Sequence, residues 1–277
     1  MTAPRPFALV LMLSLALLAM GAAPGRAATG ELFAAEVEVP DASAEARGEG
    51  VVDAFATVLT KVTGRPDAES FAAWPQLRDA ADRLMIEYRY RTEAPPSSVA
   101  EPTAPPRTLL YVRFDRQGIE SLLRQNRLPL WGDTRPATLL LLAVERGTER
   151  FIYTPDAMPE AARAISEASK RRGIPIVEPL MDLEDRGMLR FNEVWGGFPE
   201  VIEQVTARYA QDALLVGRLF SEGGDAWRAQ WTLHVDGARD QWQSQGALAE
   251  TLREGVHGLA DLLARRYVPD AASAEER

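Results

Sequence analysis

Residues 174–219 read IPIVEPLMDLEDRGMLRFNEVWGGFPEVIEQVTARYAQDALLVGRL, and this stretch decides the fold class. It begins with a short run of strand-forming residues and continues through an acidic turn and a Trp-Gly-Gly-Phe-Pro corner. It ends with a helix-length segment and a buried strand. A strand, a helix and a second buried strand in this order are typical of a parallel crossover. The stretch therefore predicts the centre of an α/β layer.

The segments on either side extend this predicted layer. Residues 137–144 form a continuous apolar run, which is typical of a strand covered on both faces, and a helix is expected over 158–172. After the central stretch the period changes to two over 227–235, and Gly237 turns the chain back as a hairpin. A final amphipathic helix over 248–267 completes a parallel core with an appended antiparallel hairpin.

The first half of the chain shows another order of elements. Residues 32–39 alternate as a half-buried strand does, and a helical apolar stripe over 51–62 stops at Gly-Arg-Pro. Two further alternating segments, 84–91 and 108–114, are expected to pair antiparallel, and a short helix follows from Asp115. The order strand, helix, strand, strand, helix predicts an α+β unit.

These patterns divide the chain into two predicted domains of mixed α+β and α/β class. The first is an α+β domain over 30–132, in which the proline-rich segment 93–107 is expected to be a flexible loop. The second is an α/β domain over 136–268, followed by a polar tail at 269–277. Residues 1–27 precede both domains and have the layout of a secretory signal peptide.

The amino-terminal segment predicts the compartment. Arg5 is followed by an apolar run over 7–20 and by small residues up to Ala27, a pattern that favours export and cleavage over a membrane anchor. The chain has no cysteine, which excludes a lipid-anchored lipoprotein, disulfides and thiolate chemistry. An exported protein without disulfides suggests a bacterial periplasm. We expect a soluble periplasmic protein with no integral membrane segment after the signal is removed.

Net charge and motif content limit the possible activities. A formal charge of -9 argues against a nucleic-acid surface, because phosphate binding needs a basic footprint. No hydrolase elbow, phosphate loop or dinucleotide fingerprint occurs, and His234 and His257 belong to no metal-binding spacing. We therefore predict no catalytic residue, no metal and no cofactor. Arg89, Arg91 and Arg113 suggest a basic strand face for an anion, or else a solvated face paired with Glu87.

An acidic cluster in the central stretch is the first candidate binding site. Asp182, Glu184 and Asp185 place three carboxylates in four residues after a strand end, where ligands often bind in open α/β sheets. A hard-cation site or a general-acid pair is one interpretation. The other is a solvated or capping turn whose charge is neutralised by Arg186 and Arg190.

The aromatic corner is the second candidate. Trp195, Gly196, Gly197 and Phe198 put two flexible glycines between two large rings, just before a helix opened by Pro199. Exposed rings would form a stacking platform for a sugar or a partner protein. Buried rings would plug the end of the sheet, as aromatic residues beside tight turns usually do.

Several short motifs carry a family resemblance. They are VLTKVTGR at 58–65, YRY at 88–90, LPLWG at 128–132, DLED at 182–185, VWGGF at 194–198 and LLVGRL at 214–219. With the signal peptide, they make the chain resemble a proteobacterial secreted family, domain of unknown function 2066, which implies no particular activity. The second half is also similar at fold level to the TolB amino-terminal domain and the curli-secretion lipoprotein. That similarity implies a scaffold for protein contacts.

Two functional hypotheses follow. The first is a non-catalytic protein-binding module of the cell envelope, which contacts an envelope protein through the acidic turn and the aromatic corner. The second is a periplasmic small-ligand binder or hydrolase that uses the acidic cluster. A concave pocket that gathers the carboxylates with distant residues would favour the second hypothesis, and a flat exposed turn would favour the first.

Overall fold

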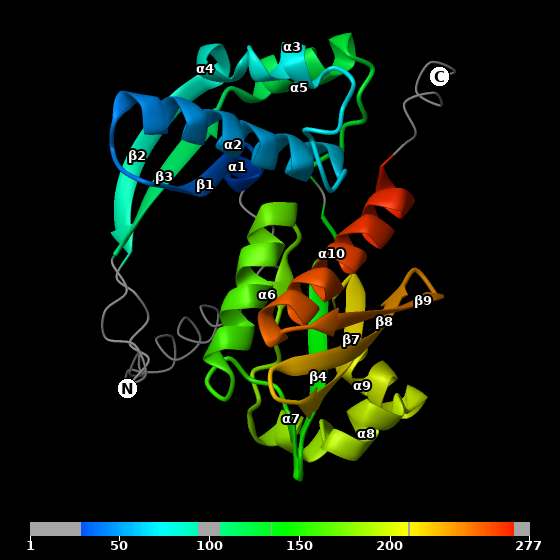
Figure 1. Cartoon of the computed structure of the whole chain (residues 1–277). Helices are drawn as coiled ribbons and strands as arrows, with labels where there is room; N and C mark the ends of the chain where they lie inside the picture. Colours follow the sequence, from blue (N-terminus) through cyan, green and yellow to red (C-terminus); the bar gives the residue numbers. More distant parts are fainter. Residues whose placement is uncertain (1–28, 94–105, 134, 210, 269–277) are drawn as a thin grey trace, which may run out of the picture.

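The computed structural model describes residues 29–93, 106–133, 135–209 and 211–268. Two separate β-sheets with their helices make up this part of the chain (Figure 1). One is a small antiparallel sheet, and the other is a larger sheet with both parallel and antiparallel strands. The predicted fold class is thereby confirmed. The predicted signal peptide, the tail and nearly all of the proline-rich loop lie outside the described residues.

The small sheet has the strand order β1-β3-β2. Its unit consists of α1 (Thr29–Leu32), β1 (Ala34–Val39), α2 (Ala44–Thr63), α3 (Trp74–Arg78), α4 (Ala81–Leu84), β2 (Met85–Glu93), β3 (Arg107–Phe114) and α5 (Arg116–Gln125). Helix α2 packs on one face of this sheet, where Val37, Leu110 and Val112 contribute to a shared apolar core. The opposite face carries charged side chains, because alternate strand residues point to opposite sides.

Helix α2 is the main support of this unit, and its ends follow the signals in the sequence. The Ser43 side chain accepts a hydrogen bond from the N–H of Ala46 at the start. At the other end Gly64 adopts φ 72°, a left-handed conformation that glycine takes without strain. The expected stripe from Val51 to Val62 is buried.

The large sheet has the order β5-β4-β7-β8-β9, and the short strand β6 also pairs with β4. Its unit consists of β4 (Thr138–Arg146), β5 (Glu149–Ile152), α6 (Pro159–Arg172), β6 (Ile176–Val177), α7 (Leu183–Met188), α8 (Phe191–Gly196), α9 (Pro199–Tyr209), β7 (Ala213–Gly223), β8 (Ala226–Val235), β9 (Ala238–Gly246) and α10 (Leu248–Tyr267). Strand β4 runs parallel to β6 and β7, and the other pairs are antiparallel. The predicted parallel core and appended hairpin are both present.

Three elements of this unit differ from the sequence prediction. The acidic turn and the aromatic corner lie largely within two short helices, α7 and α8, which the apolar spacing did not reveal. Strand β5 was also not predicted, and it forms a hairpin with β4 through a turn at Gly147 with φ 60°. All three elements are short, so they carry too few residues to show a period.

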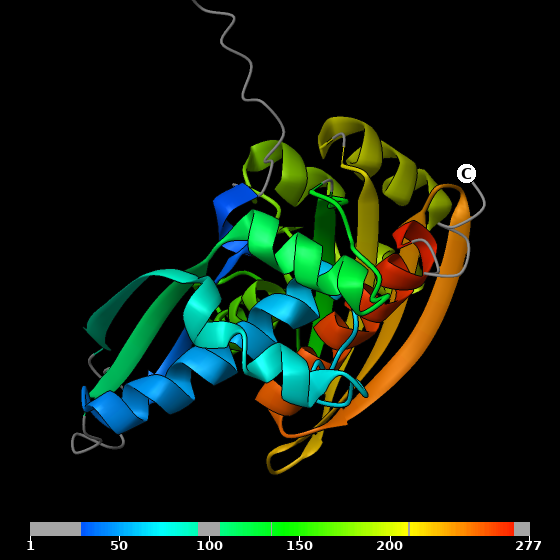
Figure 2. The same ribbon diagram turned by 90° about the horizontal axis from the view of Figure 1, so that it is seen from above.

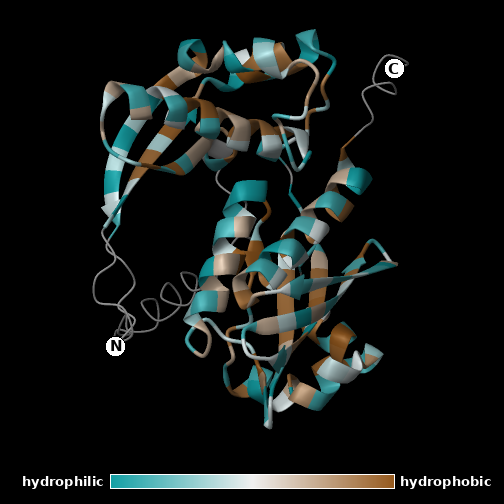
Figure 3. Ribbon diagram, in the orientation of Figure 1, coloured by the Kyte–Doolittle hydropathy of each residue, from teal (hydrophilic) through white to brown (hydrophobic). Residues whose placement is uncertain are grey.

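Helices cover both faces of the large sheet. Leu140, Leu142 and Leu215 point to the side of α6 and α10, and Leu139 and Leu141 point to the side of α8 and α9. Figure 3 shows the resulting concentration of hydrophobic residues on β4 and β7. This double burial explains the continuous apolar run of β4.

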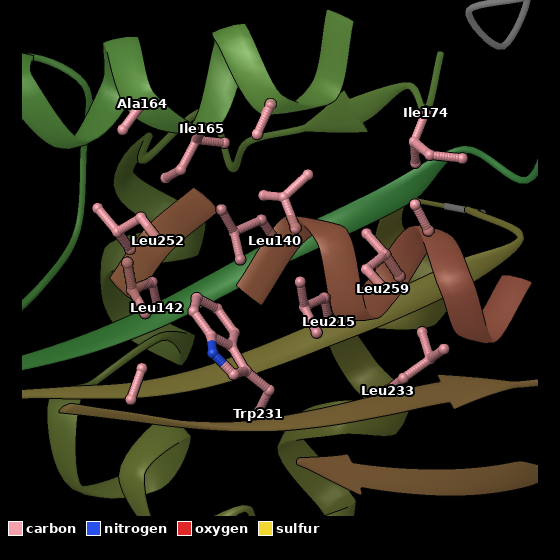
Figure 4. Packing of buried hydrophobic residues seen from close by; sticks show 14 of the residues in the cluster. Leu140, Leu142, Ala164, Ile165, Ile174, Leu215, Trp231, Leu233, Leu252 and Leu259 are labelled. Carbon is pink, nitrogen blue, oxygen red and sulfur yellow. The ribbon is translucent and has the colours of Figure 1, made fainter. Parts of the chain in front are cut away.

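Trp231 fills the centre of the larger core, among leucines from β4, β7 and α10 (Figure 4). Its indole N–H donates to the Ser244 hydroxyl at 2.8 Å, and that hydroxyl donates to the carbonyl of Thr251 at 2.7 Å. Gly255 of α10 lies against the Trp231 ring. The ring thus links β8, β9 and α10.

The two units lie side by side, with α2 of the first against α6 of the second (Figures 1 and 2). The last carbonyl groups of α2 have no partners within the helix, and they bind donors from the rest of the chain. These bonds join Lys61 O to Arg135 Nη2 (2.8 Å), Val62 O to Trp131 N (2.6 Å) and Gly64 O to Arg172 Nη2 (3.2 Å). Two guanidinium groups at the negative end of a helix dipole strengthen the joint.

The helices of the described residues lack the features of a membrane span, which needs about 20 predominantly apolar residues. None of them is both long and apolar enough to cross a bilayer.

Candidate functional site

The predicted site residues lie in the segment that connects β6 to β7. Helices α8 and α9 of this segment cover one face of the large sheet, where Val194 and Val205 pack against β4 and β7. Helix α7 precedes them at one end of α9. The three helices therefore form the outer layer of the molecule on this side (Figure 1).

Asp182 begins helix α7 as its N-cap. Its Oδ1 accepts hydrogen bonds from the N–H groups of Glu184 at 3.1 Å and Asp185 at 3.0 Å. The N–H of Asp185 and the neighbouring Arg208 guanidinium hold the pKa of Asp182 below its ordinary value. This geometry matches the capping-turn interpretation of the acidic cluster.

Asp185 is fully buried, unlike its two acidic neighbours. Its Oδ2 accepts hydrogen bonds from the N–H of Met181 at 2.8 Å and from the Tyr209 hydroxyl at 2.5 Å. The same hydroxyl accepts a bond from the N–H of Leu180 at 2.8 Å. Burial, and then the bond to Asp185, raise the pKa of Tyr209. The buried carboxylate thus ties the start of α7 to the end of α9.

Arg208 contacts all three carboxylates of the cluster. Its guanidinium lies 2.5 Å from Oδ2 of Asp182 and 3.2 Å from Oδ1 of Asp185, and it also pairs with Glu184. Among the described residues, Arg186 and Arg190 form no ion pair with the cluster, so the neutralising residue was wrongly predicted. Arg208 is distant in sequence, and only the folding of α9 onto α7 brings it there.

This arrangement limits the chemistry of the cluster. The bound guanidinium occupies the space between the carboxylates, where a cation would have to lie. In the part of the chain that the structure describes, no group of three or more histidine or carboxylate side chains is placed to hold a metal ion. The cluster acts as a structural link between α7 and α9.

The two rings of the aromatic corner point in different directions. Trp195 is half-buried, stacks on Phe191 with ring centroids 5.0 Å apart, and meets Phe220 edge-on at 6.3 Å. Phe198 remains 50% exposed. Gly197 ends α8 with φ 65°, and a side chain at Gly196 would collide with the Phe198 ring. Trp195 therefore packs against the sheet through Phe220, and of the two rings only Phe198 is exposed to solvent.

Two leucines beside the acidic cluster are far more exposed. Leu180 is 76% exposed and Leu183 is 89% exposed, and sequence reasoning did not single out either of them. With Phe198 they make up half of the six large hydrophobic residues that are exposed in the described chain. We name Leu180, Leu183 and Phe198 the α7–α9 surface. The signal in the sequence was an apolar residue on each side of Met-Asp, in a segment without any helical or strand period.

Leu180 and Leu183 lie at one end of helix α9 and Phe198 at the other. The helix has 11 residues and so spans about 16 Å. The bonds of Tyr209 and Arg208 to α7 fix the leucine end, and the contacts of α8 with α9 fix the phenylalanine end. The three exposed side chains are therefore held by a rigid frame.

Two cavities lie elsewhere in the molecule. A charged cleft of about 1050 Å³ runs between the small sheet, α2 and α6, and a smaller space of about 510 Å³ lies beside Trp131 and Tyr267. Neither is lined by a residue of the acidic cluster or the aromatic corner. Asp182 and Glu184 lie in an exposed turn, and Asp185 is buried beneath it.

The predicted basic strand face is present but largely paired. Arg113 binds Glu87 at 2.5 Å and Arg91 binds Glu36 at 2.8 Å. Arg89 lies over the Tyr111 ring at 4.2 Å from its centroid. The predicted pairing with Glu87 therefore holds for Arg113, whereas Arg91 pairs with Glu36 instead.

Comparisons with known proteins give a family match for the first part of the chain. A family model described as a domain of unknown function, number 8605, matches residues 27–132, which is less than half of the chain. The resemblance to domain of unknown function 2066 was wrong, because the matching family is a different one. The quoted motifs are short and include a glycine-capped helix end at 58–65, which many unrelated helices share.

Curated proteins and solved structures add no functional argument. No curated protein matches the chain. A crystal structure of competence or damage-inducible protein from Enterobacter asburiae is similar, with 10% identity over 55% of this chain and 94% of that chain. Its TM-score is 0.24, which is too low to support an inference about this protein.

Proposed function

We propose that this protein is a protein-binding module of the bacterial cell envelope, exported to the periplasm. Its contact with a partner is made by the α7–α9 surface, through Leu180, Leu183 and Phe198. The leader-like first 27 residues support the compartment.

The observation that carries the proposal is the exposure of two leucines on a well-held turn. Leu183 is 89% exposed although it opens helix α7, and no local period requires an apolar residue there. Apolar anchors surrounded by polar groups are the usual composition of a protein interface. Asp182, Glu184 and Arg208 supply such a rim around the leucines.

The bonding of the acidic cluster speaks against the alternative of a hydrolase or small-ligand site there. Asp185 is buried and bonded to Tyr209, and Arg208 holds the other carboxylates. A general acid or base must reach a substrate, and a nucleophile needs an open approach. We therefore assign the cluster to the support of the binding surface.

The test uses chemical crosslinking in intact periplasm, followed by purification of the captured partner. Three proteins are compared: the wild type, a Leu180→Ser/Leu183→Ser variant, and an Ile86→Ser/Tyr88→Ser control from the exposed apolar residues of β2. We expect the wild type and the control to capture the same protein. The leucine variant should bind the purified partner about tenfold more weakly or worse, as the loss of central anchors implies.

Folding of each variant is checked by its circular dichroism spectrum and melting temperature. The leucines are exposed, so their replacement should leave stability within about 0.5 kcal/mol of the wild type. Equal capture by wild type and folded leucine variant would contradict the proposed surface. Recovery of the protein in the cytoplasm, with residues 1–27 still attached, would contradict the proposed compartment.

A further inference from the structure

The charged cleft contains an unused strand edge. Among the described residues, strand β1 has a neighbour on one side only, since the small sheet runs β1-β3-β2. The residues Ala34, Ala35, Glu36, Val37 and Glu38 all line the cleft of about 1050 Å³. Because successive strand residues point to opposite faces, five in a row can line a space only if it follows the strand's edge.

The main-chain groups of β1 are oriented for pairing along that edge. The N–H of Phe114 donates to the carbonyl of Phe33 at 2.9 Å, so Phe33 points toward β3. In an antiparallel ladder the direction alternates, and Ala34, Glu36 and Glu38 therefore turn their N–H and C=O groups outward. The outward carbonyl of Ala34 already accepts a 2.7 Å bond from Lys61 Nζ. That bond marks one end of the open edge.

The two sides of the edge differ in chemistry. On one side, Val37 faces the helix α2. The small residues of α2 that line the cleft there are accompanied by two charged ones, Asp53 and Lys61. On the other side, α6 presents the exposed cations Arg163, Lys170 and Arg171 together with a single carboxylate, that of Glu167. Within the described residues, none of these three cations forms an ion pair, whereas Glu36 is already paired with Arg91.

We propose that this cleft binds an extended peptide of a partner protein, which adds to β1 as a fourth strand of the small sheet. The peptide carries acidic side chains at every second position, directed at the cations of α6, and small apolar side chains between them, directed at α2. The main-chain bonds supply affinity, and the two walls supply the period-two specificity. Strand β1 has six residues, so the open edge accommodates a segment of about 20 Å. This site is separate from the α7–α9 surface, and its test does not depend on that surface.

A direct test measures binding of a synthetic peptide of alternating glutamate and valine, as long as β1, to the whole protein. We expect saturable binding and slower hydrogen exchange at the amides of Glu36 and Glu38. The same peptide N-methylated at every amide keeps its charge but has no N–H group left to donate to a strand. It should bind about tenfold more weakly or worse, since several main-chain hydrogen bonds are lost.

The matched protein variants are Glu36→Pro and Glu36→Ala. Both remove the carboxylate, but only proline removes the outward N–H, and proline is tolerated on strand edges. Glu36→Pro should weaken peptide binding about tenfold relative to Glu36→Ala, by the loss of one bond and of close approach. A lysine–valine peptide should not bind, because it would face the cations of α6.

Four results would overturn the proposal. They are equal binding of the plain and the N-methylated peptide, equal binding by the two Glu36 variants, preference for the lysine–valine peptide, and absence of binding by the glutamate–valine peptide. Sedimentation of the protein alone tests whether a second copy of the protein occupies the edge of β1. A dimer that Glu36→Pro abolishes and Glu36→Ala preserves would show that a second copy, and not a partner peptide, fills the edge.

Discussion

Lys61 is a buried cation held by carbonyl groups alone. It is 7% exposed, and its Nζ donates to Ala34 O at 2.7 Å and to Glu31 O at 3.2 Å. Burial lowers its pKa from 10.5 to about 8. No residue of the described chain forms an ion pair with it. The sequence shows only a lysine near the end of a helix, where cations are common.

This burial predicts a specific pH dependence of stability. Between about pH 8 and 10.5 the folded protein has lost the Lys61 proton and the unfolded chain still holds it. The unfolded state then binds more protons, so the contribution of Lys61 to the free energy of unfolding rises with pH in this window. Below pH 8 both states are protonated, and the cost of burying the charge is constant.

The measurement is chemical denaturation of the wild type and Lys61→Met at several pH values from 7 to 10.5. The difference in free energy of unfolding should shift in favour of the wild type by up to about 1.4 kcal/mol per pH unit above pH 8. Val62→Ala serves as a control, because Val62 is also a buried residue of α2 but has no titratable group. A Lys61→Met difference that stays flat with pH would refute the assignment.

At the scale of single elements, the long helices and strands were predictable, whereas the short elements α7, α8 and β5 were not. Helix α2, helix α10 and the β8–β9 hairpin follow the apolar period and the glycine signals of the sequence. Helices α7 and α8 have six residues each, too few to show a period, and they hold the predicted site residues. For this reason the sequence did not show which residues surround the candidate side chains.

Two glycines in helices illustrate how packing outweighs propensity. A Cβ at Gly48 of α2 would meet nothing within 4 Å, whereas a Cβ at Gly255 of α10 would lie 2.3 Å from the Trp231 ring. Gly48→Ala should therefore stabilise the protein by about 0.5–1 kcal/mol. Gly255→Ala should destabilise it by about 1–3 kcal/mol or more, because the fixed indole cannot move aside.

Denaturant unfolding of both variants measures whether their changes in the free energy of unfolding have opposite signs. The two substitutions are chemically identical, so the sign of the change reports the space around each helix. A stabilised Gly255→Ala variant would mean that Trp231 does not pack against α10 as described.

At the scale of the whole molecule, the two units are joined through one helix end. Arg172 is 1% exposed and binds both Gly64 O of the first unit and Asp261 of the second, at 3.2 and 2.5 Å. Each unit has its own apolar cluster, and polar bonds to the end of α2 contribute to the joint. Such bonds depend strongly on direction, so their loss should loosen the link without emptying either core.

Calorimetry of Arg172→Met tests the joint. We expect the cooperative unfolding of the two units to separate into two transitions and the total stability to fall by about 3 kcal/mol, since buried partners lose a charged donor. Lys170→Met, on the same helix but exposed, is the control. A single transition at an unchanged temperature in Arg172→Met would show that the units are coupled by other contacts.

The sequence by itself determined the class of fold, the long elements and the signals at their ends, because these depend on periods and caps within short stretches of chain. The continuous apolar run of β4 predicted a strand covered on both faces, and the structure confirms this prediction. The tertiary structure alone decided that Arg208 neutralises Asp182, Glu184 and Asp185, that Leu180 and Leu183 stand in solvent, and that the edge of β1 lies open beside α6. These features arise from contacts between residues far apart in the chain, and no local pattern encodes such contacts.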